Sequence, residues 1–151
     1  MIDDKAEGKT DALELVGEIT RRAGHEIRNA LSGVAVNVEV VKSRAARGDG
    51  ADALAPFADR AALQVGVASA LTDGLLGLVG SVLAAQADGK LRTLPAAGAG
   101  SRIELKVYGD RASVILSNIK HLADHIGVAV EEHAERVILT VSPEGTGHSK
   151  N

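Results

Sequence analysis

The sequence lacks cysteine and is nearly free of aromatic residues, and these absences exclude several classes of protein. It has one phenylalanine, one tyrosine and no tryptophan, so aromatic ligand pockets and base-stacking surfaces are not expected. Without cysteine, disulfide bonds and thiolate metal ligands are excluded. The formal net charge is −3, with no basic stripe, so nucleic acid is not an expected partner. The polar segment 1–10 does not resemble a secretory signal, and we expect a flexible N-terminus on a cytoplasmic protein.

Apolar and small residues recur at steps of three and four through the first third of the chain, the spacing of a helix packed in a bundle. Asp11 and Glu14 form the pattern of an N-cap and its capping-box partner, which predicts a helix from Ala12 to about Arg47. The glycine-rich turn 48–50 would end it. The predicted stripe is Leu13, Val16, Thr20, Ala23, Ile27, Ala30, Val34, Val38 and Val41.

A second stripe of the same spacing predicts a helix that begins between Asp52 and Pro56 and ends before Gly89. Two long helices joined by a short loop form an antiparallel hairpin, here over residues 11–88. A lone hairpin leaves its apolar stripes half exposed, whereas two hairpins bury them in a four-helix bundle. We therefore predict a homodimer, although the sequence also allows a heterodimer.

The segment 65–85 carries a single charged residue, Asp73, and is long enough to span a bilayer. An aspartate near the middle of such a span would cost about 2.5–3.5 kcal/mol on the insertion scale. Alanine, glycine and serine also dilute the hydrophobicity of the segment. We predict a buried helix of a soluble protein, with no membrane partner.

The second half of the chain has a different period. Alternating residues over 103–108 and 136–141 predict strands, and a short third strand is predicted at 128–131. A helix capped by Asp110 and ended by Gly127 lies between them. The predicted fold is α+β, a long helical hairpin followed by a small β-α-β-β domain. The expected order is an N-terminus at 1–10, a hairpin at 11–88, a linker at 89–100, the small domain at 101–142 and a flexible tail at 143–151.

His25 is the residue we expect to carry chemistry. It lies two positions after Ala23 and two before Ile27, so it faces away from the bundle seam. An exposed imidazole is mostly neutral near pH 7, and its ring nitrogen can attack phosphorus and leave again. Glu26 is placed to orient the imidazole. Neighbours about one turn away provide a surround for a phosphoryl group or an acidic partner, namely Arg21, Arg22, Arg28 and Asn29.

The string His25-Glu26-Ile27-Arg28-Asn29-Ala30-Leu31 resembles the phosphoacceptor box of bacterial sensor histidine kinases, with Ala30 in place of the usual proline. In that family the box lies on the first helix of a dimerising hairpin. The resemblance implies that His25 accepts the phosphoryl group and that Glu26 is its acid–base neighbour. It also implies that Asn29 affects dephosphorylation and that Leu31 contacts a receiver domain.

The second half resembles a truncated ATP-binding domain of the same kinases. Asn118 matches the first of two asparagines, but the second, a magnesium ligand in that family, falls at Leu122. Pro143 stands where the family has an adenine-reading aspartate, although Gly145 and Gly147 are retained. Without the magnesium ligand, the aspartate and a lid, we expect no cofactor and no ATP-dependent kinase activity. Mg²⁺ is expected only on a partner receiver domain.

A phosphoacceptor hairpin beside a degenerate ATPase-like domain is similar to the dimeric histidine phosphotransferases of bacterial phosphorelays. The implied partners are a response-regulator receiver domain and a sensor histidine kinase. One alternative is an interaction module that binds or regulates these proteins without exchanging phosphate, and another is an unrelated bundle whose motif arose by chance. His121 and His125, four residues apart, have the spacing of a metal pair. We interpret them instead as histidines in the last turn of a helix.

Overall fold

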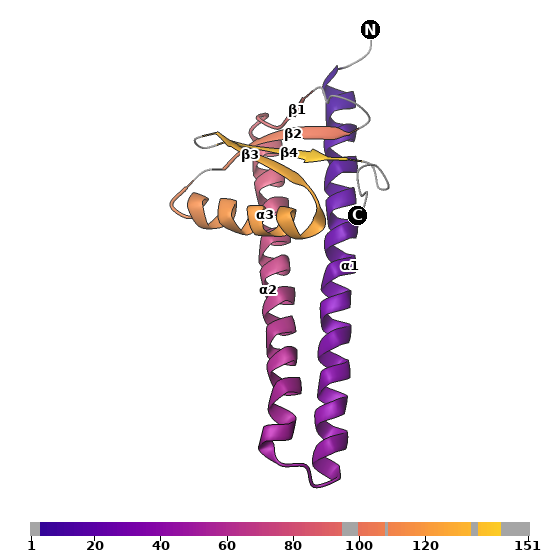
Figure 1. Cartoon of the computed structure of the whole chain (residues 1–151). Coiled ribbons are helices and arrows are strands. Elements are labelled where there is room, and N and C mark those ends of the chain that lie inside the picture. Colours follow the sequence, from indigo (N-terminus) through magenta and orange to yellow (C-terminus); the bar gives the residue numbers. More distant parts are fainter. Residues whose placement is uncertain (1–3, 95–99, 108, 134–135, 143–151) are drawn as a thin grey trace, which may run out of the picture.

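The computed structural model describes residues 4–94, 100–107, 109–133 and 136–142, with side chains from residue 12 onward (Figure 1). Two long helices form an antiparallel hairpin, and a small antiparallel sheet with one helix packs on it away from the 48–50 turn. The predicted α+β class is confirmed. The elements are α1 (Asp4–Ala46), α2 (Ala51–Ala87), β1 (Arg92–Leu94), β2 (Ser101–Lys106), α3 (Ala112–Ile126), β3 (Ala129–His133) and β4 (Arg136–Val141).

Glycines end the two long helices, as predicted. Gly48 and Gly89 adopt positive φ angles of 87° and 68°, which cost other residues free energy because of their Cβ atoms. The next residue then folds back onto the last helical turn. The Asp49 amide donates to the Arg44 carbonyl at 3.1 Å, and the Lys90 amide donates to the Ala85 carbonyl at 2.8 Å. These are the long bonds of Schellman motifs.

Two predicted helix starts are wrong, and α2 begins at Ala51, one residue before the predicted range of 52–56. Helix α1 begins at Asp4, so Asp11 is not its N-cap, and residues 4–10 of the expected flexible N-terminus are helical. The segment from Asp4 to Asp11 contains no proline, and nothing in its backbone chemistry forces a stop. Helix α3 begins at Ala112 after Arg111 rather than at an Asp110 cap, and among the described residues no side chain caps it.

The strands are all antiparallel and lie in the order β1-β2-β4-β3. In β2 and β4 every second residue is buried, as the predicted alternation requires. Strand β1 was not predicted, since 92–94 falls in the expected linker. Three residues are too few to show a period, and β1 is defined only by its pairing, for example Thr93 opposite Ile103. Residues 134–135, between β3 and β4, and the predicted tail at 143–151 lie outside the described residues.

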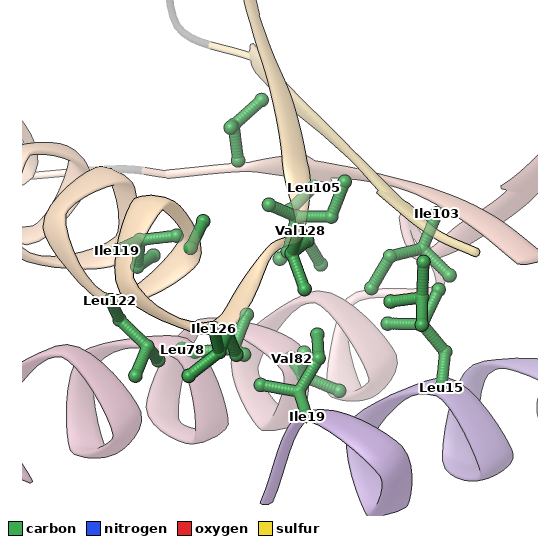
Figure 2. Close-up of a cluster of buried hydrophobic side chains, with 14 of the residues drawn as sticks. Leu15, Ile19, Leu78, Val82, Ile103, Leu105, Ile119, Leu122, Ile126 and Val128 are labelled. Atoms are coloured by element: carbon green, nitrogen blue, oxygen red, sulfur yellow. The ribbon is translucent and has the colours of Figure 1, made fainter. Parts of the chain in front are cut away.

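The hairpin and the sheet share one hydrophobic core, although the sequence predicts two domains joined by a linker. Helix α3 crosses α2 and packs against both α2 and the inner face of the sheet (Figure 1). Figure 2 shows the side chains that meet there from α1, α2, α3 and β2. They include Leu15, Ile19, Leu78, Val82, Ile103, Leu105, Ile119, Leu122 and Ile126. Beyond this core the hairpin continues as two helices without a covering layer.

The α2–α3 contact depends on Gly74, which is buried. A Cβ atom at this position would lie 2.6 Å from Leu122 Cβ and 2.6 Å from the Asn118 carbonyl oxygen. Gly74→Ala should therefore lower the free energy of unfolding by about 1–3 kcal/mol, as overpacking does.

Gly80, in the same helix, is the matched control because a Cβ there meets nothing within 4 Å. Gly80→Ala should raise stability by about 0.5–1 kcal/mol through helix propensity. Urea denaturation of both variants measures the two effects. If the two variants changed the free energy of unfolding by the same amount and in the same direction, the close approach of α3 to Gly74 would be contradicted.

Candidate functional site

His25 lies on the exposed side of α1, as its spacing predicts. Ala23, two residues earlier, is fully buried in the core, and Ile27, two residues later, is partly buried against it. Because residues two apart in a helix point in widely different directions, burial of these neighbours turns the imidazole outward. An exposed imidazole on a rigid helix is accessible to a group on another protein.

Glu26 faces α3 rather than solvent alone. Its Oε2 atom lies 3.6 Å from Nε2 of His125, and both side chains are 36% exposed. The sequence predicts that Glu26 orients His25, whereas in the structure Glu26 contacts a different histidine. Sequence analysis missed His125 as a neighbour because only the packing of α3 on the hairpin brings the two together. The contact links α1, next to His25, to the last turn of α3.

Arg22 is largely buried, and its guanidinium group makes contacts within the chain. It is only 13% exposed and donates from Nε to Glu18 Oε1 at 2.8 Å. Its Nη2 donates to the Ser142 carbonyl oxygen at 2.7 Å, so it fastens the chain after β4 to α1. Arg21, at 53% exposure, also donates to Glu18, at 3.0 and 3.1 Å. Both predicted cations are thus shared with one carboxylate that sequence analysis did not single out, although its spacing is that of helical ion pairs.

The arginine side chains also change the acidity of Glu18. Hydrogen bonds from Arg21 and then Arg22 lower the pKa of the Glu18 carboxyl from 4.5 to about 2. A carboxyl whose pKa is lower in the folded state stabilises the fold above the unfolded pKa, and this contribution is lost as the pH falls through the folded pKa.

Glu18→Gln should therefore lower stability by about 0.5–1 kcal/mol at pH 7, the upper range for solvent-screened pairs. The difference from the wild type should shrink as the pH falls from 4.5 toward 2. Thermal unfolding across this range measures it. Glu39→Gln is the control, because its pair with Lys42 is 72% and 68% exposed. If the stability difference between Glu18→Gln and the wild type did not change with pH, the ion-pair explanation would be contradicted.

Arg28 and Asn29 are exposed one turn beyond His25. The Arg28 Nε atom donates to the Gly24 carbonyl at 3.2 Å, which holds the guanidinium stem along the helix near His25. Leu31 is 50% exposed, but six residues along a helix place it on a different side from His25. The imidazole, Arg28 and Asn29 therefore form the accessible part of the predicted site.

At the position where the resemblance to the ATP-binding domain places a magnesium ligand, the structure has a packed helix. Leu122 is 1% exposed and packs in the shared core against α2. The segment with Pro143, Gly145 and Gly147 lies outside the described residues. His121 and His125 have ring centroids 6.5 Å apart, and within the described part of the chain no three His, Cys, Asp or Glu side chains form a metal-binding group.

Both helices of the hairpin carry large apolar side chains that remain exposed. On α1 these include Leu13, Leu31 and Val38, and on α2 they include Leu76, at 66% exposure, and Leu83, at 60%. Leu13 and Leu31 are 18 residues apart, which is five helical turns, and Leu31 and Val38, like Leu76 and Leu83, are seven apart. Each set therefore lies on one stripe of its helix. We call this set the open stripe. The buried stripe of α1 lies beside it, at Ala12, Leu15, Ile19 and Ala23, because the sheet and α3 cover that side of the helix.

Helix α2 is long and apolar enough, by length and composition, to cross a membrane. Core helices of soluble proteins meet the same criterion, and the open stripe contributes to it.

No protein-family model matches the chain, and no curated protein is significantly similar to it.

Proposed function

We propose that this protein is a histidine phosphotransferase that relays a phosphoryl group between receiver-domain aspartates of response regulators through His25. The observation that carries the proposal is an exposed His25, on the first helix of a hairpin, inside the segment 25–31 that resembles a phosphoacceptor box. Arg28 and Asn29 share its accessible side. We place this activity in the cytoplasm.

The chemistry is a reversible transfer between two proteins. A ring nitrogen of the neutral imidazole attacks phosphorus, and the P–O bond to the receiver aspartate breaks as the N–P bond forms. The aspartate leaves as a carboxylate, and the second ring nitrogen carries the remaining proton. We assign to Glu26 the role of accepting a hydrogen bond from the ring nitrogen that carries this proton. This role requires the Glu26 carboxylate to turn from His125 toward His25. Arg28 offsets the charge of the phosphoryl group.

The phosphoryl group comes from another protein rather than from ATP in this proposal. The resemblance requires a magnesium ligand where Leu122 is packed into the core. A buried leucine supplies no oxygen ligand for Mg²⁺. Helix α3 serves instead to pack on the hairpin and to place His125 near Glu26.

A second copy of the chain is the partner we propose for the open stripe. Monomeric soluble proteins seldom expose large contiguous apolar patches, and two such hairpins bury their stripes in a four-helix bundle. The sheet and α3 pack on another side of the hairpin and leave the stripe accessible. The dimer would carry two His25 side chains facing outward.

An interaction module without phosphate exchange is the second candidate. Arg22 and Glu26, two of the residues expected to serve the phosphoryl group, make contacts within the chain, with Ser142 and His125. Such contacts suit a protein that binds a receiver domain through its shape alone. Under this alternative, receiver binding would be retained without any phosphohistidine.

The test is phosphoryl transfer with purified components. Radiolabelled phosphorylated receiver domains from the same genome, and labelled ATP alone, are each mixed with the protein. Acid-labile label from a receiver but not from ATP is the expected result. Tight receiver binding without label would favour the interaction module, and label from ATP alone would contradict the proposed loss of kinase activity.

A further inference from the structure

The outer face of the sheet concentrates positive charge, although the chain as a whole has a net charge of −3. Ile103 and Leu105 of β2 point into the core, so Glu104 and Lys106 lie on the opposite face. The strand register places Arg92 of β1 opposite Glu104 and Arg136 of β4 opposite Lys106. Side chains directly opposite each other in antiparallel strands lie on the same face, about 4.5–5.5 Å apart.

These side chains line a cavity of about 270 Å³ between the end of α2 and the sheet. The lining residues are Gly89, Lys90, Arg92, Glu104, Lys106 and Arg136. Four are cationic and one is an acid, which gives the described lining a formal charge of +3. The acid, Glu104, is only 20% exposed and lies 3.6 Å from Arg136 Nη1. It therefore pairs with Arg136, and the register places it opposite Arg92.

The pairing of Lys106 with Arg136 is unfavourable for the sheet by itself. Like charges directly opposite each other destabilise antiparallel strands, whereas opposite charges stabilise them. Neither side chain is needed for the core, which lies on the other face. An anion bound beside the two side chains would be attracted by both of them.

We infer that this cavity binds a small, multiply charged phosphate anion. Pockets for drug-sized ligands measure roughly 300–1,000 Å³, and the cavity falls below this range. Inorganic phosphate and pyrophosphate are compact, multiply charged anions that suit a cavity of this size. Guanidinium groups hold phosphate oxygens through two parallel hydrogen bonds, and Arg92 and Arg136 stand on either side of the Glu104–Lys106 strand. No residue of α1 lines the cavity, so this inference does not depend on the role proposed for His25.

Isothermal titration calorimetry at fixed ionic strength tests the inference. Pyrophosphate and inorganic phosphate are titrated separately into the wild type, and sulfate serves as the non-phosphate anion. Saturable binding of one or both phosphates, tighter than that of sulfate, is the expected result. The two arms distinguish a site for a single phosphate from a site for a diphosphate.

Lys106→Gln and Arg136→Gln should each weaken phosphate binding by at least about tenfold, because each removes a charge-assisted contact. Arg102→Gln is the matched control, since Arg102 lies on the same face of β2 but near Glu131 and outside the cavity lining. It should leave binding within about twofold. Thermal unfolding of each variant checks that the sheet is intact, and His25→Gln should bind phosphate like the wild type. Absence of saturable binding to the folded wild type, or equal weakening by Arg102→Gln, would overturn the site.

Discussion

His25→Gln should reduce phosphoryl transfer from receiver domains to the background level, a loss on the order of a thousandfold or more. Glutamine keeps a polar side chain of similar length but has no nucleophilic ring nitrogen. Because His25 is exposed and its neighbours Ala23 and Ile27 provide the packing, stability should change by no more than about 0.5 kcal/mol. Rapid-quench transfer from a labelled receiver, combined with a thermal melt, measures both quantities.

His121→Gln is the control for His25→Gln. His121 is also an exposed helical histidine, but it lies on α3 outside the segment that resembles a phosphoacceptor box. This variant should accept phosphate at the wild-type rate. If His25→Gln still carried acid-labile label, another residue would be the acceptor, and the proposed function would lose the observation on which it rests.

The double variant Leu76→Glu/Leu83→Glu should convert the proposed dimer into monomers. Both side chains belong to the open stripe, at 66% and 60% exposure. In a four-helix bundle each would be buried twice by symmetry. Placing unpaired carboxylates in that interface should weaken association by at least about 3 kcal/mol. Sedimentation equilibrium at micromolar concentration measures the change. Both positions are exposed in the single chain, so its fold should survive.

Leu63→Glu is the matched control for the dimer. Leu63 is 70% exposed on α2, and it is 13 residues before Leu76, a spacing that puts it on another side of the helix. It should leave the oligomeric state unchanged. A wild type that sediments as a monomer, or a Leu63→Glu variant that dissociates as readily as the double variant, would rule out the open stripe as the dimer interface.

Much of the local structure was predictable because it depends on neighbouring residues. The period of three and four indicated that α1 and α2 are long helices, and Gly48 and Gly89 fixed their C-terminal ends through the positive φ that the turns require. The alternation of apolar residues in β2 and β4 selected the face that enters the core. The exposure of His25 followed from the same periodicity.

The rotation of α1 about its own axis was less well predicted. Its sequence offers two adjacent apolar stripes, one through Leu13 and Thr20 and one through Leu15 and Ile19. Periodicity alone cannot rank them, because both have helical spacing. The sheet and α3 cover the second stripe, which is buried, and leave Leu13 exposed.

By itself, then, the sequence determined the hairpin, the alternating strands and an outward-facing His25, since each depends on residues within a turn or a strand of one another. Only the tertiary structure decided the pairing of β1 with β2, the contact of Glu26 with His125, the hold of Arg22 on Ser142 and the burial of Leu122 against α2. Apart from the β1–β2 pairing, these contacts join segments far apart in the chain. Their partners are selected by how the apolar faces of the hairpin, α3 and the sheet fit together, a choice that no local pattern encodes.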